Sequence, residues 1–312
     1  MAGRCLVTAL RDLVAEYLAL RRALGYTLHR EGWLLPRFVT FLEARGQAWI
    51  TTPLAMAWAS EPVGATPSTT AHRLTIIRGF AEYVRAQDPR TDVPSRDLMP
   101  ITKQRQSPYL YTDAEVEALL AACRRLHTRG VRRTAYTLFG LLAATGLRVG
   151  EAIALDRTDV DARQASLIVR HGKFNKSREV PLHPTTVEAL RTYAQHRDAA
   201  HPRPRSPSFF LTIHGTRPHV QNVWQTFDRL RRLAGLPREP RAPRIHDLRH
   251  SFAMDTVLRW SRQHLDIHAR LPLLSTYLGH VGPSSTYWYL TATPALLELA
   301  AQRVEPWRGT HP

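Results

Sequence analysis

The chain has 312 residues, of which 43 are Lys or Arg and 26 are Asp or Glu, so its formal net charge is +17. Hydrophobic residues make up 44% of the sequence, which is enough to build packed cores and excludes a disordered basic tail. The charge indicates a polyanionic partner, and the length suits two domains of ordinary size.

Membrane and secreted proteins are also excluded by the residue pattern. No apolar stretch reaches the roughly 18 residues that a membrane helix needs, and Arg11, Asp12 and Glu16 interrupt any secretory signal. The only cysteines, Cys5 and Cys123, are too few for a disulfide scaffold or a Cys-rich metal site. We therefore expect a cytoplasmic protein with no membrane partner.

Residues 1–97 are predicted to form an N-terminal helical domain. Thr52 is the expected N-cap of a helix with Pro53 at its first position, and residues 68–87 form a further amphipathic helix. Together these elements predict a bundle of about four helices. Apolar residues at helical spacings of three and four include Leu13, Tyr17, Leu20 and Leu24.

An exposed linker is expected at residues 98–110, where polar residues and Pro replace the apolar periodicity. The second domain, residues 111–312, opens at Thr112, which is predicted to form a capping box with Glu115. Two domains joined by a polar linker can close as a clamp around a rod-shaped partner, and duplex DNA is one such partner.

The second domain is predicted to be mostly helical. Two β-rich runs, residues 166–169 and 178–182, flank a turn and predict one hairpin. The fold class is therefore mainly α with a small β-sheet, an α+β domain. The predicted helices cover residues 134–144, 149–155, 220–234, 246–260 and 294–304.

The few lysines are a possible sign of proton transfer. The chain has only Lys103, Lys173 and Lys176, although its basic residues are numerous. Arg supplies charge equally well but does not give up its proton near neutral pH, whereas Lys can. Chance retention explains the same pattern, so both readings stay open.

Four segments of the second domain stand out, in this order: Thr145-Gly146-Leu147-Arg148-Val149-Gly150-Glu151, then Gly172-Lys173 with Asn175-Lys176 and Val180-Pro181-Leu182, then His246-Asp247-Leu248-Arg249-His250, and finally Leu278-Gly279-His280 with Tyr289 nine residues later. In order and spacing these segments resemble the motifs of the tyrosine recombinase, or phage integrase, family, with a Xer-like pattern. The first domain resembles the family's helical core-binding domain only in type and length.

The chemistry of phosphodiester cleavage explains this set. Negative charge builds on the phosphate oxygens when a nucleophile attacks phosphorus, and Arg148 and Arg249 would meet it through their planar forks. No acidic metal cluster accompanies them, so neither a metal nor another cofactor is expected. Tyr289 would be the nucleophile, because a phosphotyrosine conserves the bond energy for rejoining.

The resemblance also implies supporting roles. Lys173 would be the general acid for the leaving 5′ oxygen, and Lys176 would contact DNA. His246 would assist deprotonation of the tyrosine or bind the phosphate, and His280 would donate a hydrogen bond to a nonbridging oxygen. Glu151 would orient Arg148, although a solvated acid explains the residue nearly as well.

Several neighbouring residues offer rival assignments. Tyr287 is the nearest alternative nucleophile, but residues two apart on a helix face different sides, and the spacing from the LGH motif selects Tyr289. His250 lies four residues after His246, yet no third metal ligand is apparent. Tyr277 and Trp288 are assigned to packing.

The predicted function is site-specific DNA recombination. The partner would be double-stranded DNA with inverted half-sites, bound by a homodimer on each site and by a tetramer in the synapse, where sister recombinases could also take part. The apolar stripe of residues 294–304 would dock on a neighbouring protomer or pack in cis. Integration or excision of a mobile element through a Holliday junction is the favoured setting.

Two alternatives remain at this point. A type IB topoisomerase uses the same nucleophile and arginines but only relaxes supercoils. The HxLRH motif at residues 246–250 and the LGH motif at residues 278–280 favour recombination over this alternative. A DNA-binding protein without catalysis is the other, and a full set of catalytic residue types counts against it.

Overall fold

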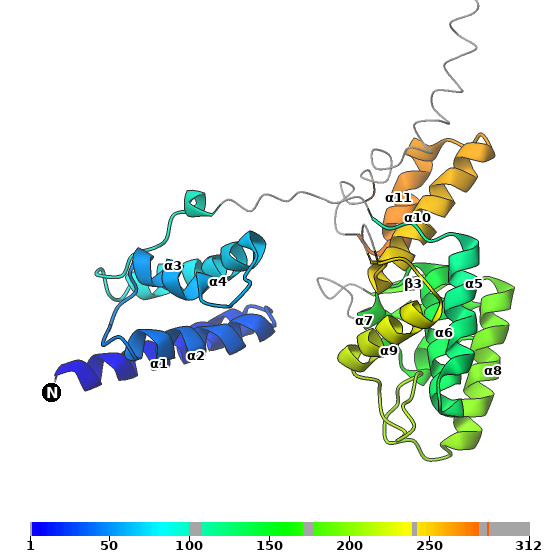
Figure 1. The fold of residues 1–312 in the computed structure, drawn as a ribbon, viewed down its shortest axis with the longest axis horizontal. Coiled ribbons are helices and arrows are strands. Elements are labelled where there is room, and N and C mark those ends of the chain that lie inside the picture. The colour runs from blue at the N-terminus through cyan, green and yellow to red at the C-terminus, as the bar shows by residue number, and fades with distance from the viewer. Residues whose placement is uncertain (1, 100–107, 171–176, 239–241, 281–285, 287–312) are drawn as a thin grey trace, which may run out of the picture. The chain divides into compact units, whose positions relative to one another are not determined.

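The computed structural model describes residues 2–99, 108–170, 177–238, 242–280 and 286, and the chain divides into two compact units (Figure 1). The N-terminal unit is Met1–Arg105 and the C-terminal unit is Gln106–Pro312. Among the described residues, none of the helices is both long and apolar enough to cross a membrane. Each unit is described by itself below.

The N-terminal unit is a helical bundle with its own apolar core. Phe38 of the second helix and Phe80 of the fourth are fully buried, and Tyr17 of the first packs on Phe80 with ring centroids 5.7 Å apart. Trp58 of the third helix packs on Phe38 with ring centroids 5.2 Å apart, so all four α-helices contribute to one core, as the predicted bundle requires. The elements are α1 (Ala2–Ala23), α2 (His29–Glu43), α3 (Thr52–Ser60), α4 (Pro67–Arg85) and the 3-10 turn η1 (Arg96–Leu98).

Two details of this unit differ from the sequence prediction. The N-cap of α3 is Thr51 rather than Thr52, so Pro53 is the second helical residue. Leu20 and Leu24 follow the helical spacing of α1 but are 49% and 65% exposed, because they lie near or beyond the end of the helix. Helical spacing identified the helix correctly but overestimated how far its apolar face is covered.

The C-terminal unit is mainly helical around a small sheet. Its apolar core gathers Leu119, Phe139, Val180 and Leu230 from α5, α6, β3 and α9, and a smaller cluster joins α10 to α11. The elements are α5 (Asp113–Ala122), η2 (Cys123–Arg125), α6 (Arg129–Thr145), α7 (Val149–Ala154), η3 (Arg157–Asp159), β1 (Val160–Asp161), β2 (Ser166–Val169), β3 (Arg178–Pro181), α8 (Pro184–Ala200), α9 (Val220–Leu233), α10 (Ile245–Arg262) and α11 (Ile267–Leu278).

The sheet is antiparallel in the order β1-β2-β3. Strand β2 pairs with β3 through Leu167 opposite Val180 and Val169 opposite Arg178, which confirms the predicted pairing of the two β-rich runs. Strand β1 was not predicted, because two residues are too short for a periodic pattern. The turn with Lys173 and Lys176, and the predicted helix at residues 294–304, lie outside the described residues.

The start of the C-terminal unit agrees with the sequence prediction. Thr112 accepts a hydrogen bond from the backbone N–H of Glu115, whose carboxylate accepts one from the backbone N–H of Thr112. This capping box begins α5 where predicted.

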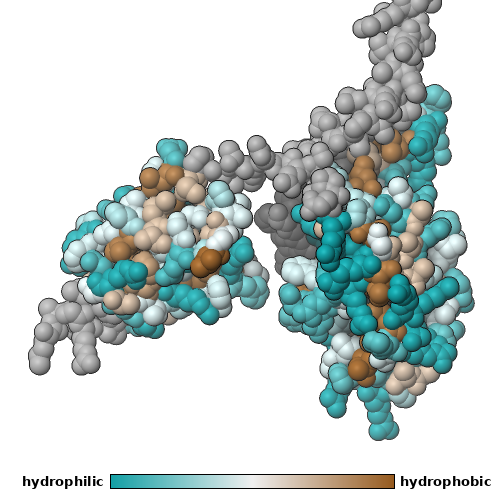
Figure 2. Space-filling view, viewed as in Figure 1, coloured by the Kyte–Doolittle hydropathy of each residue, from teal (hydrophilic) through white to brown (hydrophobic). Residues whose placement is uncertain are grey.

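On the face drawn in Figure 2, hydrophilic residues cover much of both units, and hydrophobic residues lie in small groups among them.

Gly146→Ala is expected to lower the free energy of unfolding by about 2–3 kcal/mol, because φ is +62° and a Cβ would lie 2.7 Å from the Phe252 ring. The control, Gly150→Ala, adds a Cβ with no atom within 4 Å and should change stability by less than about 1 kcal/mol. Urea unfolding of the two variants measures the difference, and equal midpoints would contradict it.

Candidate active site

The turn between α6 and α7 places Arg148 at the edge of the site. Gly146 ends α6 in the left-handed conformation, and its N–H donates to the carbonyl of Leu142. Arg148 is the N-cap of α7, and Glu151 accepts its backbone N–H at 3.1 Å. This short turn therefore fixes the backbone from which the Arg148 side chain extends.

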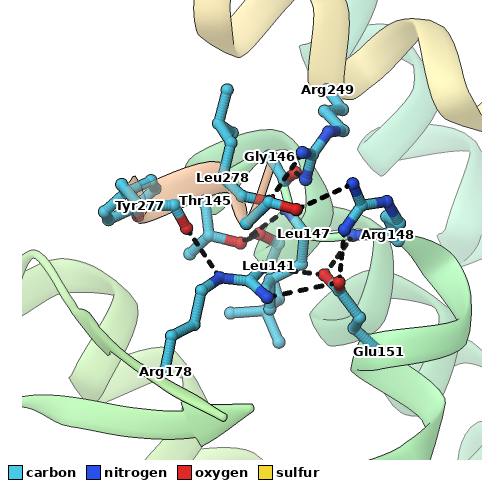
Figure 3. Close-up of polar contacts among 11 residues, drawn as sticks. Leu141, Thr145, Gly146, Leu147, Arg148, Glu151, Arg178, Arg249, Tyr277 and Leu278 are labelled. Atoms are coloured by element: carbon cyan, nitrogen blue, oxygen red, sulfur yellow. Dashed lines mark hydrogen bonds and ion pairs between the residues drawn. The ribbon is translucent and has the colours of Figure 1, made fainter. Parts of the chain in front are cut away.

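Arg249 links two backbone segments of the site (Figure 3). Its side chain comes from α10 and is 2% exposed. Nη1 donates to the carbonyl of Gly146 at 2.7 Å, and Nη2 donates to the carbonyl of Leu278 at 2.6 Å. One guanidinium thus joins the α6–α7 turn to the end of α11, segments more than 100 residues apart.

Arg148 is held from two sides. Nη1 forms an ion pair with Oε1 of Glu151 at 2.6 Å, and Nη2 donates to the carbonyl of Gly279 at 3.1 Å. The side chain keeps 29% of its surface exposed, whereas that of Glu151 keeps 8%. The guanidinium is therefore oriented by the protein, while part of the side chain stays exposed to solvent.

Glu151 has a second partner, Arg178, which the sequence analysis did not single out. Nη2 of Arg178 lies 2.8 Å from Oε2 of Glu151, and Nε donates to the carbonyl of Tyr277 at 2.7 Å (Figure 3). Burial raises the pKa of Glu151, but hydrogen bonds and charge from Arg178, and then from Arg148, outweigh it and lower the pKa overall. The carboxylate is therefore ionised at neutral pH.

The start of α10 is fixed by a buried carboxylate. Asp247 is fully buried and accepts the backbone N–H of Arg244 at 2.8 Å. Nearby, the backbone N–H of Tyr111 donates to the Ser251 hydroxyl at 2.7 Å, and that hydroxyl donates to the carbonyl of Asp247 at 3.1 Å. The segment that precedes α5 is thereby hydrogen-bonded to the helix that carries Arg249.

Three histidines lie near the arginines. The rings of His246 and His250 meet edge to face with centroids 4.8 Å apart, and Nδ1 of His280 lies 2.7 Å from the Thr286 hydroxyl. Desolvation, and then the charges of Arg249 and Arg148, lower the pKa of His246, although its ring keeps solvent access. The same causes lower the pKa of His280 to about 3. Both rings are therefore neutral at pH 7 and can exchange hydrogen bonds with a phosphate or a phenol.

The structure brings together five of the residues singled out from the sequence, namely Arg148, Glu151, His246, Arg249 and His280. Lys173, Lys176 and Tyr289 lie outside the described residues, as do Tyr287 and Trp288. Tyr277 stacks on Phe252 with centroids 5.6 Å apart, in agreement with its assignment to packing. Across the part of the chain that the structure describes, no three His, Cys, Asp or Glu side chains are grouped to hold a metal ion.

The pH dependence of stability should depend on His250, because burial, followed by repulsion from His246, lowers its pKa to about 4. The unfolded chain binds this proton near pH 6.5, so stability is present above that pH and is lost as the pH falls toward 4. The free energy of unfolding should therefore fall between pH 7 and pH 5. Allowing for solvent screening, His250→Asn should make that fall smaller by about 1 kcal/mol.

Urea unfolding at the two pH values measures this effect. The matched control is His268→Asn, at an exposed histidine on α11. This variant should show the same fall in the free energy of unfolding as the original chain. An identical pH dependence in the His250 variant and the original chain would contradict the explanation.

Comparison with known proteins identifies the family of the chain. The model of the phage integrase family matches residues 110–295. The "Putative integrase/recombinase y4rB" of Sinorhizobium fredii is 42% identical over 307 residues, covering 96% of this chain and 98% of the relative. The tyrosine recombinase XerD of Caulobacter vibrioides is 32% identical over 229 residues, covering 72% of this chain and 71% of the relative.

The fold also matches solved structures. The Tn1549 transposon integrase, solved in complex with transposon right end DNA, superposes with a TM-score of 0.66 at 18% identity, over 94% of this chain and 98% of that one. At this identity the likeness concerns the fold alone. The sequence matches cover most of this chain, and the fold agrees with them. The chain therefore belongs to the phage integrase family of tyrosine recombinases, enzymes that cleave and rejoin DNA.

Proposed function

We propose that this chain is a site-specific DNA recombinase that works through a covalent 3′-phosphotyrosine at Tyr289 and a Holliday junction. The observation that carries the proposal is the pair Arg148 and Arg249, whose guanidinium groups are both bonded to backbone carbonyls at the end of α11. A preorganised pair of guanidinium groups suits a phosphate whose equatorial oxygens gain charge in the transition state.

The rigidity of Arg249 supports this role. Its fork is bonded to two carbonyls and is almost completely buried, so little reorganisation is needed when a phosphate binds. Arg148 is more exposed and would complete the clamp from the side of α7. Glu151 orients Arg148 through a 2.6 Å ion pair.

The proton transfers follow from the chemistry of the exchange. The Tyr289 oxygen forms a bond to phosphorus as the bond to the 5′ oxygen breaks, and Lys173 gives that oxygen a proton. His246, neutral at pH 7, takes the phenolic proton, and His280 donates a hydrogen bond to a nonbridging oxygen. Lys176 contacts the DNA backbone, and rejoining reverses the same steps without ATP or a cofactor.

The partner is double-stranded DNA with inverted half-sites. The charge of +17 favours phosphate contacts, and the N-terminal unit, with its helical bundle, would act as the core-binding half of a clamp. A homodimer on each site and a tetramer in the synapse, with or without sister recombinases, would carry out the exchange in the cytoplasm. The name of the relative in Sinorhizobium fredii, a putative integrase/recombinase, favours a role in moving a mobile element.

A nicked suicide substrate carrying the recombination site should trap a covalent adduct. Tyr289→Phe is expected to abolish the adduct while DNA binding persists, because only the phenolic oxygen is lost. Tyr287→Phe is the matched control and should keep the adduct. Electrophoresis under denaturing conditions, with mass spectrometry of the linked peptide, measures both outcomes. An adduct lost in the Tyr287 variant and kept in the Tyr289 variant would refute the assignment.

The same reaction should be insensitive to chelation. Because guanidinium groups supply the charge that stabilises the transition state, excess EDTA should leave the adduct yield within about twofold of the untreated reaction. Arg249→Ala should lower the yield by at least about a hundredfold, the scale expected when one preorganised donor to the transition state is removed. A reaction that stops with EDTA and resumes with Mg²⁺ would refute the arginine clamp.

A further inference from the structure

Arg178 is a buried charged residue that the proposed chemistry leaves without a role. It is the first residue of β3, and its side chain is only 11% exposed. Long basic side chains are rarely this buried unless they are paired, and Arg178 is paired with a carboxylate that also serves the site. Its environment therefore points to the active site rather than to the surface.

The contacts of Arg178 converge on Glu151. Nη2 lies 2.8 Å from Oε2, and Nη1 lies 3.3 Å from Oε1, so the fork faces both carboxylate oxygens. The same two oxygens accept the Arg148 side chain at 2.6 Å and its backbone N–H at 3.1 Å. Glu151 is thus held between two arginines and cannot rotate without breaking bonds to both (Figure 3).

A second observation comes from Gly279. This residue has φ +66°, and a Cβ built on it would lie 2.6 Å from Nη1 and 2.9 Å from Cζ of Arg178. The Arg178 guanidinium therefore fills the space beside the backbone that links Leu278 to His280. Through Nε it also donates to the carbonyl of Tyr277, so it contacts the turn whose other carbonyls bind Arg148 and Arg249.

Charge balance suggests what Arg178 contributes. Glu151 alone would neutralise Arg148, because one carboxylate and one guanidinium sum to zero. With Arg178 present, the three groups carry a net positive charge, and Arg148 keeps its attraction for a phosphate. Removing Arg178 would also leave the buried carboxylate with only one cation, which favours tighter pairing with Arg148.

We propose that Arg178 is a positioning residue for DNA cleavage, which holds Glu151 so that the Arg148 guanidinium stays oriented toward the scissile phosphate and the group of Arg148, Glu151 and Arg178 keeps a net positive charge. This inference rests on the proposed function, since it assigns a role within the same site. Arg178 acts through Glu151, and it does not contact the reacting atoms.

The test is the single-turnover rate of adduct formation on the suicide substrate, measured with the full chain at saturating protein. Arg178→Gln should slow cleavage by about tenfold to a hundredfold, the scale typical of residues that orient a reacting group. Its Kd for DNA should change by less than about threefold, because the proposal gives Arg178 no contact with the DNA. Arg178→Lys keeps the charge but not the fork and should recover part of the rate.

The control variant is Arg191→Gln. Arg191 forms an ion pair with Glu188 on α8, and both side chains are at least 59% exposed. The Arg191→Gln variant should therefore cleave DNA at the rate of the original chain. Thermal melting identifies variants that fail to fold. If Arg178→Gln is one of them, Arg178→Lys carries the test, and a rate within twofold of the original would overturn the proposal.

A double-mutant cycle with Glu151→Gln separates positioning from a general structural effect. If Arg178 acts through Glu151, the double variant should cleave no more slowly than the slower single variant, within about threefold. Rate losses that multiply would overturn the proposal, as would an Arg178→Gln chain that reacts within twofold of the original. An original chain that forms no adduct would instead refute the proposed function, and the positioning role with it.

Discussion

The active site depends on the hydrogen bonds from Arg249 to the carbonyls of Gly146 and Leu278. These carbonyls belong to helix ends, where backbone acceptors have no partner within the helix. A buried guanidinium satisfies them and brings α6, α10 and α11 together at one point. The packing of these helices and the proposed chemistry of the site therefore depend on the same side chain.

The second constraint is a buried carboxylate shared by two arginines. Isolated burial of Glu151 would be costly, since a buried ion keeps its charge only when it is paired and hydrogen-bonded. Here one carboxylate is bonded to α7, β3 and, through its two partners, the end of α11. Breaking one such pair typically costs several kcal/mol because the remaining charge stays buried. The network thus gives a precise geometry to a site whose own charges repel one another.

Much of this arrangement could be predicted from the sequence, because its signals are local. The Thr112–Glu115 capping box follows from two residue types three positions apart, and the strand at Ser166–Val169 follows from a β-rich run. The long amphipathic helices follow from apolar residues at helical spacing. The family motifs likewise named Arg148, His246, Arg249 and His280, which the structure brings together. The assignment of Tyr289 and Lys173 stays a prediction, since neither residue is among those described.

What the sequence could not predict are the contacts between distant segments. Arg178 reaches Glu151 across 27 residues, and Tyr111 reaches Ser251 across 140, distances at which no periodic pattern carries information. Nor could the cap of α3 be placed, because adjacent threonines at positions 51 and 52 are equivalent by composition. Tertiary packing decides such cases, and here it decides the geometry of the site.

Two left-handed glycines at the site restrict how this enzyme can diversify. Gly146 faces the Phe252 ring and Gly279 faces the Arg178 guanidinium, so any side chain at either position meets both a strained backbone and an occupied volume. Directed evolution toward new DNA targets is therefore best confined to exposed faces of the helices, where substitutions leave these turns intact. The scaffold can acquire new specificity while its reaction centre stays unchanged.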